Sequence, residues 1–563
     1  MLTLIALLSP SADACGGFAC SNSAPVMQAA ERILFAVDEE VGEVEAHVQI
    51  TFTGESTDFG WIVPVAGIPE LFLSTDDLFS TIYFPTNPTY TLTVKELGDC
   101  RSDVMFESAG TASDADSSPS SPAAEDGGVN VLASGNVGPY STVVLEADSS
   151  AALLGWLAEN DFDVPANLDP VLAPYLASGQ NFLALRLKPG NTSGDIAPLG
   201  MRYAGDKPSI PIQLTSVAAV PDTRLEVYVL GRDRAVPESY LHVQPNDMAY
   251  DYFTQTVLYP DIITKAADEA GGHAFATDFT GSTVLLRDAL YSDGMFAEDE
   301  LAAANDVFEW MSTILSGGFV TGSGYYYYLT FDINLANAIR TVLPLPADLA
   351  ADGVSETMFW SNLPYYTDSF DAAAFDVAAA TSAVDAGFLE PRRHANALFE
   401  AHDRITRLTS SLDAIEMTVD PTFVFNADMP QSVVVGHEAT LLYHCENEED
   451  RDEALRNIIY PGEISVNLPP EEWFQDEGIT EYEYLSDLAA FNASVIEQTG
   501  ETGEASLLTD NRPALAEIVD GLNASFDAEF GSDSGGCGCN GTGSPAAPLL
   551  AAAAALLATR RRR

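Results

Sequence analysis

A series of apolar runs with strand periodicity occupies the first half of the chain and constrains its fold most strongly. Residues 32–37 form a run of strand length, residues 44–52 alternate apolar and polar side chains, and the acidic, glycine-containing segment between them suits a hairpin turn. Further apolar runs of strand length lie at 59–65, 89–94, 141–145, 182–187, 210–214 and 225–230. These runs predict a β-rich N-terminal half.

The periodicity changes to that of an amphipathic helix from about Met248. Apolar residues recur at helical spacing over 253–270, 299–315, 369–386 and 392–412. The two patterns together predict an α+β fold with mixed sheets, in which a helix-rich C-terminal half follows the β-rich half.

Charge separates this chain from several classes of protein. Its 563 residues include 84 Asp and Glu against 24 Lys and Arg, a formal net charge of −60. Nucleic acids and anionic bilayers are bound through basic surfaces, so neither is an expected partner of the body. Because 47% of the residues are hydrophobic, the chain is too apolar to stay disordered and long enough for several domains.

Composition shifts predict the domain layout. A signal peptide over 1–14 precedes a β-rich α+β domain over 15–245, which carries a disordered Ser-, Ala-, Asp- and Gly-rich insertion at about 108–128. A helix-rich domain follows over 246–445. An acidic spacer over 446–536 then leads to a C-terminal sorting or anchor tail over 537–563.

The first residues predict export. The apolar run Leu2–Leu8 is followed by Ala12-Asp13-Ala14, a small-x-small site that suits cleavage after Ala14. No basic residue precedes Arg32, a departure from the usual signal peptide. An apolar N-terminal strand is the alternative interpretation.

The last residues suggest a second localisation signal. Cys537 and Cys539 are followed by an apolar run over 545–558 and by Arg560, Arg561, Arg562 and Arg563. This tail resembles the MYXO-CTERM sorting signals of myxobacterial surface proteins, which implies processing near the two cysteines and display on a bacterial cell surface. A simple alanine-rich anchor would also place the chain at a membrane. The expected partners are therefore a membrane, through the tail, and an unidentified envelope or extracellular component.

Cysteine usage agrees with an oxidising location. The chain has six cysteines, and an even number in an exported protein favours disulfides. Cys15 and Cys20 could close a small N-terminal loop. Cys100 and Cys445 are the two in the body, and their pairing would contribute on the order of 4–5 kcal/mol in the loop-entropy model. Six cysteines allow fifteen pairings, so this one stays a hypothesis.

Histidine spacing gives weak metal signals. His437 and His444 lie seven residues apart in a strand-like context, and surface or interface positions suit them better than a zinc site. His394 and His402 lie eight apart in a charged helix over 390–407, too distant for one metal, and are assigned to the helix surface.

Carboxylates and aromatic residues add no firm site. Asp293-Gly294 with Glu300 matches part of a calcium loop, so calcium is considered as well, but no cofactor or metal ligand is assigned. No P-loop or nucleophile elbow occurs, so no catalytic residue is assigned. The run Tyr325–Tyr328 suits sheet packing or a stacking platform, and Trp61 suits a core.

A set of short motifs identifies a family. The set comprises 14–20 (ACGGFAC), 28–35 (QAAERILF), 47–50 (HVQI), 59–65 (FGWIVPV), 137–140 (VGPY), 156–160 (WLAEN), 210–215 (IPIQLT) and 417–423 (MTVDPTF). It resembles the bacterial domain-of-unknown-function family 2330, over roughly Cys15 to Cys445. The resemblance implies export but no activity, so no functional residue is carried over.

Two functions remain open at this point. The first is a non-catalytic surface or envelope protein that binds or assembles, favoured by both export signals and by the lack of a catalytic motif. The second is an exported hydrolase with a carboxylate or histidine site. A cleft with converging carboxylates or histidines would favour the second.

Overall fold

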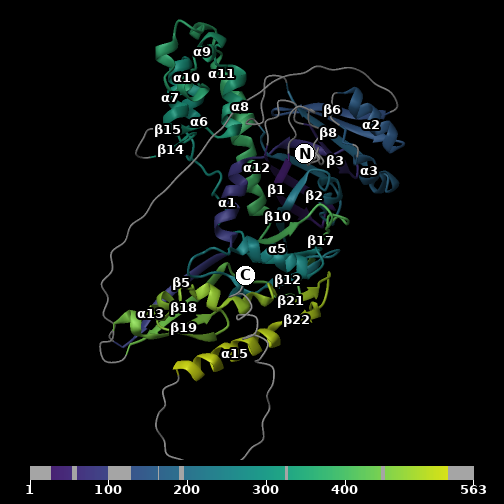
Figure 1. The fold of residues 1–563 in the computed structure, drawn as a ribbon. Coiled ribbons are helices and arrows are strands. Elements are labelled where there is room, and N and C mark those ends of the chain that lie inside the picture. Colours follow the sequence, from purple (N-terminus) through teal and green to yellow (C-terminus); the bar gives the residue numbers. More distant parts are fainter. Residues whose placement is uncertain are drawn as a thin grey trace, which may run out of the picture.

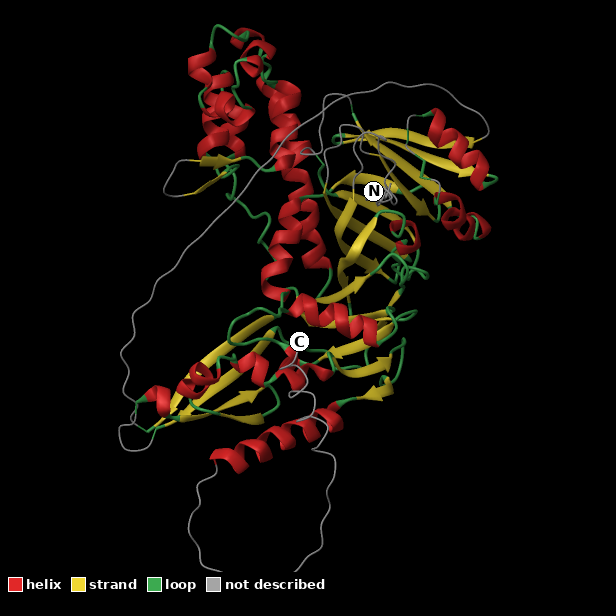
Figure 2. Ribbon diagram, in the orientation of Figure 1, coloured by secondary structure: helices red, strands yellow, loops and turns green. Residues whose placement is uncertain are grey.

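A ten-stranded mixed sheet forms the centre of the molecule (Figure 1). The computed structural model describes residues 27–53, 60–98, 129–160, 162, 164–165, 167–188, 196–323, 328–445 and 450–530. Two four-stranded sheets and a helical lobe surround the large sheet (Figure 2). The predicted α+β class with mixed sheets is confirmed.

The large sheet draws its strands from nearly the whole described chain. In spatial order they are β22 (Ser506–Asp510), β21 (Ala493–Gln498), β12 (Leu241–Pro245), β13 (Ala274–Ser282), β16 (Arg404–Leu412), β10 (Ala219–Gly231), β1 (Met27–Asp38), β2 (Glu43–Thr53), β9 (Leu199–Ala204) and β4 (Glu70–Leu73). Strands β1 and β10 pair in parallel, as do β12 and β13, and the other pairs are antiparallel.

Side-chain alternation gives this sheet two buried sides. Ile33 and Phe35 of β1 point to one side and join the core shared with a four-stranded sheet. Leu34 and Ala36 point to the other side and pack under helices. Because both sides are covered, any polar residue of the central strands must find a partner inside the protein.

The first four-stranded sheet packs on one side of the large sheet and carries two helices. In spatial order it comprises β3 (Gly60–Val65), β8 (Asn181–Leu187), β7 (Tyr140–Ala147) and β6 (Val129–Val137), with α2 (Ser150–Glu159) and α3 (Leu168–Ala177). Trp61 of β3 is 9% exposed in the core between the two sheets, as its apolar neighbours predict.

The other side of the large sheet is covered by helices. They include α1 (Asp76–Thr86), α5 (Tyr259–Glu269) and a continuous rod formed by α11 (Val377–Val384), a π-helical segment (Asp385–Leu389) and α12 (Glu390–Ala401). Figure 2 shows this rod running from the helical lobe down to the sheet, and α12 packs beside α1. The rod therefore brings residues of the helical lobe onto the sheet.

The helical lobe has its own aromatic core, which includes Trp310 and Trp360. Its other elements are α6 (Glu298–Ala303), α7 (Val307–Ser316), β14 (Thr321–Ser323), β15 (Tyr328–Thr330), α8 (Ile333–Val342), α9 (Ala347–Ala351) and α10 (Glu356–Ser361). Three short elements lie elsewhere: α4 (Ile212–Thr215), β11 (Arg234–Pro237) and β17 (Phe423–Asn426).

The prediction of an acidic spacer over 446–536 is wrong for the residues that the structure describes. Residues 450–530 supply two strands of the large sheet and two of the four strands of a second four-stranded sheet. That sheet comprises β20 (Ile464–Leu468), β19 (Leu455–Tyr460), β18 (Gly436–His444) and β5 (Thr89–Leu97), covered by α13 (Glu471–Glu477), α14 (Glu481–Tyr484) and α15 (Arg512–Phe530). Most of its described acidic residues occupy exposed positions, which a count of charges does not reveal.

Two other boundaries differ from the prediction. The helix predicted over 392–412 ends at Ala401, and Arg404–Leu412 forms the central strand β16. The domain boundary predicted at residue 245 falls between β12 and β13, which pair with each other. The predicted strand at 210–214 is mostly the short helix α4.

Several predicted features lie outside the described residues. They are the signal peptide, Cys15, Cys20, Cys100, the insertion at 108–128, Tyr325–Tyr327, Cys537, Cys539 and the arginines 560–563. Within the described ranges, no helix combines the length and the apolar character needed to cross a bilayer.

A core substitution in the last folded segment distinguishes a packed domain from a spacer. Leu468 of β20 is 0% exposed, so Leu468→Ala should lower the free energy of unfolding by about 2–5 kcal/mol. Leu507 of β22 is 53% exposed, and Leu507→Ala should leave stability within about 0.5 kcal/mol. Urea denaturation followed by circular dichroism measures both, and a neutral Leu468→Ala would contradict the packing.

Candidate metal centre

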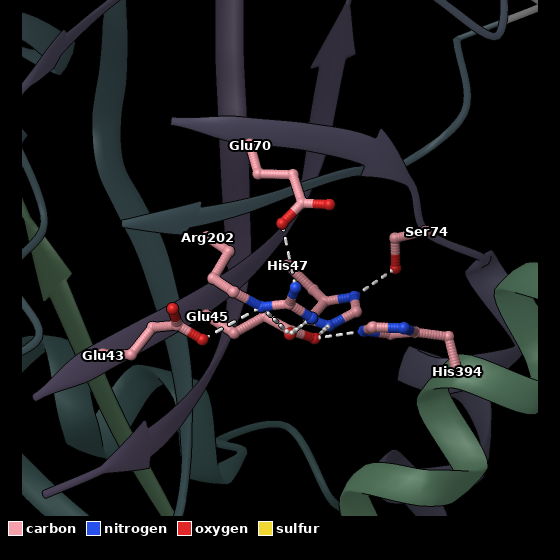
Figure 3. Close-up of polar contacts among 7 residues, drawn as sticks. All are labelled: Glu43, Glu45, His47, Glu70, Ser74, Arg202 and His394. Carbon is pink, nitrogen blue, oxygen red and sulfur yellow. Dashed lines mark hydrogen bonds and ion pairs between the residues drawn. The ribbon is translucent and has the colours of Figure 1, made fainter. Parts of the chain in front are cut away.

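A carboxylate and two histidines meet where α12 crosses the large sheet (Figure 3). Glu45 and His47 are two residues apart on β2, so both point to the helix-covered side. His394 reaches them from α12, the end of the rod that descends from the helical lobe. Their ligand atoms all lie within 4.8 Å of one another.

One oxygen of Glu45 links the two histidines. His47 Nε2 lies 2.8 Å from Glu45 Oε1, and His394 Nε2 lies 2.6 Å from the same oxygen. Glu45 and His47 are buried, whereas the His394 side chain is 28% exposed. The centre is thus reached from solvent on the side of α12.

The other carboxylate oxygen of Glu45 pairs with an arginine on the neighbouring strand. Arg202 of β9 is the register partner of Glu45, and it donates from Nε and Nη2 to Glu45 Oε2 at 3.1 and 2.8 Å. On the next strand Glu70 faces Arg202 and accepts from Nη1 at 3.0 Å. Glu43 lies 3.2 Å from Arg202 Nε. Arg202 therefore holds Glu45 in place across the sheet.

The neighbouring row of the sheet provides an aromatic wall. Gly200 of β9 lies opposite His47, and Phe72 of β4 lies opposite Gly200. A Cβ on Gly200 would meet the Phe72 ring at 2.1 Å, so the glycine makes room for that ring. Phe72 packs with its centroid 5.5 Å from the ring of His47 and 4.7 Å from that of His394.

Ser74 completes the surroundings of His47. Its Oγ lies 2.7 Å from His47 Nδ1, and its backbone carbonyl accepts from Asn334 Nδ2 of α8 at 2.7 Å. With Glu45 ionised, His47 donates from Nε2 to the carboxylate and accepts from the serine hydroxyl. The centre is therefore tied to the helical lobe at two points, through Ser74 and through α12.

The electrostatics favour an anionic Glu45 beside a neutral His47. Burial works against ionisation of Glu45, but the hydrogen bonds and charges of His394 and His47 hold the pKa of this carboxyl well below its ordinary range. Burial lowers the pKa of His47 from its ordinary value of 6.5, against the opposing hydrogen bond and charge of Glu45. A neutral imidazole and an ionised carboxylate are the forms that coordinate metal ions.

These three side chains have the chemistry of a transition-metal site. Two imidazole nitrogens and one carboxylate oxygen are ligands of zinc and of other first-row divalent ions. Ser74 and Arg202 contact the remaining polar atoms of His47 and Glu45, as outer partners do in metal sites. Among the residues that the structure describes, this is the group of three His, Cys, Asp or Glu with metal-binding spacing.

The structure separates the histidine pairs considered in the sequence. His394 belongs to the centre rather than to a bare helix surface, while His402 follows the end of α12. His437 and His444 lie seven residues apart on β18 and so point to opposite sides of the strand. His437 pairs with Asp247 at 2.9 Å, and His444 lies 2.7 Å from Asn457.

The calcium candidate finds no support in the described side chains. Asp293 lies in a turn before Gly294, and Glu300 lies in α6. Neither belongs to the group of metal-binding spacing.

Glu45 and His47 were not singled out from the sequence. The available signal was Glu45-Ala46-His47 inside an otherwise apolar strand, which places an acid and an imidazole on one buried side. The third residue, His394, lies 347 positions beyond His47, so no local pattern connects them.

Of the predicted Cys100–Cys445 pair, only Cys445 lies among the described residues. Cys445 is 5% exposed, and its backbone N–H donates to the carbonyl of Leu97 at 2.9 Å, at the end of β5. Cys100 follows this strand end by three positions but lies outside the described residues. The Cys100–Cys445 pairing stays a prediction.

Comparison with known proteins bears on the first half of the chain. Residues 9–289 match the family described as uncharacterised proteins conserved in bacteria, domain of unknown function 2330. This region belongs to that family. No curated protein and no solved structure matches the chain.

The domain-of-unknown-function family 2330 region contains part of the centre. Glu45, His47, Ser74 and Arg202 lie within it, whereas His394 lies beyond its last residue, 289. The match also ends well before Cys445, to which the sequence motifs had suggested it extends. The family region thus supplies the sheet side of the centre, and the following segment supplies the helix side.

Protonation of His47 should make metal-free protein sensitive to mild acid. Its folded pKa lies below 6.5 while the unfolded chain binds a proton near 6.5, so stability is complete above that pH and falls below it. Between pH 6.5 and 5, His47→Gln should reduce the slope of unfolding free energy by up to about 1.4 kcal/mol per pH unit, the value for one proton. Urea titrations in EDTA measure this.

The matched control is His444→Gln. His444 is exposed, so this variant should retain the slope of the unsubstituted protein. If unfolding free energy changed with pH equally in His47→Gln and in the unsubstituted protein, the prediction would be contradicted, because His47 would then bind its proton equally well in the folded and unfolded states.

Proposed function

We propose that this protein is an exported, surface- or envelope-associated protein that binds a divalent transition metal through Glu45, His47 and His394. The single observation that carries the metal assignment is the convergence of their ligand atoms within 4.8 Å from β2 and α12. The role is one of binding, in keeping with the absence of a catalytic motif from the sequence.

The donor set favours zinc over calcium and magnesium. Calcium and magnesium are held by oxygen ligands, whereas two of these three donors are imidazole nitrogens. Zinc–ligand distances of about 2.0–2.2 Å place tetrahedral ligand atoms about 3.3 Å apart. The two histidine nitrogens lie 2.8 and 2.6 Å from Glu45 Oε1, so a shift of less than about 1 Å at each would admit the ion.

The surroundings can follow the proton change that metal binding requires. Coordination through Nε2 moves the proton of His47 to Nδ1, where the hydroxyl of Ser74 accepts a hydrogen bond as readily as it donates one. Arg202 keeps its two hydrogen bonds to Glu45 Oε2, which leaves Oε1 for the ion. Both outer contacts therefore survive binding.

Zinc titration tests this proposal directly. By isothermal calorimetry the purified full chain should bind Zn²⁺ at this centre. His394→Gln should weaken that binding at least tenfold, about 1.4 kcal/mol, because one ligand is lost. His394 is partly exposed, so this variant keeps the buried packing of the centre.

His444→Gln serves as the control, since this exposed histidine lies on β18, outside the centre. It should bind zinc like the unsubstituted protein. Identical zinc affinity of all three proteins would overturn the metal assignment and leave a structural ion-pair network.

An exported metal-dependent hydrolase is the second candidate. One observation favours it: the centre has three protein ligands, the number found where catalytic zinc keeps a position for water. Turnover of esters, peptides or glycosides by the zinc-loaded protein, lost in His394→Gln, would favour this candidate over simple binding.

The location rests on the two ends of the chain. The apolar start and the tail with Cys537, Cys539 and the four terminal arginines support export, and the tail's likeness to MYXO-CTERM signals supports display at a bacterial surface. A protease added to intact cells should therefore degrade the protein, while a cytoplasmic marker stays intact. Protection of the chain until lysis would contradict surface display.

A further inference from the structure

A cavity lies on the side of the large sheet that also carries the metal centre, but at some distance from that centre. It has a volume of about 210 Å³ and is lined by Tyr83, Tyr90, Tyr250, Tyr259, Arg224 and Arg407, among others. Its floor is formed by β10 and β16, and α1 and α5 carry two of the tyrosines above it (Figure 1). Strands β1 and β10 separate β16 from the strand of Glu45 and His47.

Arg407 is the unusual feature of this cavity. It is 3% exposed, and its Nη1 has no hydrogen-bond acceptor among the described residues. Nε lies 3.0 Å from Asp278 Oδ2 but does not point at it well enough to form a hydrogen bond. A buried charged donor without an acceptor is costly and is rare in native proteins. The Nη1 group of this guanidinium is therefore available to donate a hydrogen bond to a ligand.

The acids near Arg407 are already engaged elsewhere. Asp278 sits at a β-bulge of β13 and accepts from Tyr259 at 2.5 Å and from Thr409. Glu226 accepts from Arg32 Nε at 2.8 Å and lies 3.6 Å from Arg407 Nη2. Neither carboxylate reaches Nη1.

The walls of the cavity suit a flat ligand. Tyr90 is stacked between Tyr250 and His437, with ring centroids 4.1 and 4.5 Å away, so it fixes Tyr250 in place, and the hydroxyl of Tyr259 is held by Asp278. Rings fixed in this way offer apolar surface with little loss of side-chain entropy on binding. The exposed Arg224 adds a second cation beside the buried one.

We propose that this cavity binds a small organic carboxylate, whose charged end pairs with Arg407 and Arg224 and whose flat body lies against the tyrosines. Arginine recognises carboxylates through paired, charge-assisted hydrogen bonds, which an unengaged Nη1 is suited to make. A cavity of about 210 Å³ accommodates a ligand with one ring. In a chain of net charge −60, a cavity lined by two arginines and one glutamate favours an anion locally.

The test uses 4-hydroxyphenylacetate and its neutral amide as probes of the full chain. Saturation-transfer NMR and calorimetry at pH 7.5 should show the carboxylate binding at least tenfold more tightly than the amide. Arg224→Gln should weaken binding of the carboxylate about threefold to tenfold. This residue is exposed, so the variant should fold normally.

Glu226→Gln should change affinity in the opposite direction. It removes a negative charge that lines the cavity and repels the ligand's carboxylate, and it keeps the shape of the side chain, so the carboxylate should bind more tightly. A merely structural role would make both variants weaker or leave both unchanged. Equal binding of acid and amide, no binding of either, or weakening by Glu226→Gln would overturn the proposal.

Discussion

The covering of the large sheet on both sides is the constraint on which the remaining structure depends. Strands β1, β2, β10 and β16 have one side against a second sheet and the other against helices. A polar residue on these strands is withdrawn from water and must be paired, because an unpaired buried polar group costs several times what a typical hydrogen bond contributes. The polar residues of the helix-covered side accordingly form a connected network.

Part of that network lies between the two proposed sites. From α1, Asp76 accepts from Gln49, which in turn accepts from Arg32 at 3.3 Å. Arg32 donates to Glu226, which lies beside Arg407 in the cavity proposed to bind a carboxylate. Gln49 is two residues beyond His47 on β2, so these two side chains share one side of the sheet. The two sites share one sheet face but use different side chains.

The centre also shows why a helical lobe is attached to a sheet protein. The rod of α11, the π-helical segment and α12 carries His394 down to β2, and Asn334 of α8 holds Ser74 beside His47. The π-helical segment lies directly before α12, and such segments are often found near functional sites. An ion bound at Glu45, His47 and His394 would therefore stabilise the junction between the lobe and the sheet.

Local patterns predicted the early strands well because alternation is a property of neighbouring residues. Residues 32–37 and 44–52 lie within β1 and β2, and Trp61 lies in the core. The same method failed at 392–412, where α12 ends and β16 begins within three residues. Both segments are rich in apolar and charged residues, and only pairing with β10 and β13 makes the second one a strand.

The prediction for the acidic stretch after Cys445 is wrong for a different reason. Its charge was read as evidence of an extended spacer, yet alternate and helical positions within it are apolar and pack into the second four-stranded sheet. Total charge does not report how the charges are distributed over the faces of an element.

The sequence by itself determined the α+β class and the family of the first half, because periodicity and short motifs are properties of neighbouring residues. Only the tertiary structure placed His394 beside Glu45 and His47, and Arg407 between Glu226 and Asp278. These residues are far apart along the chain, and their meeting depends on strand order and helix packing, which no short window of sequence encodes.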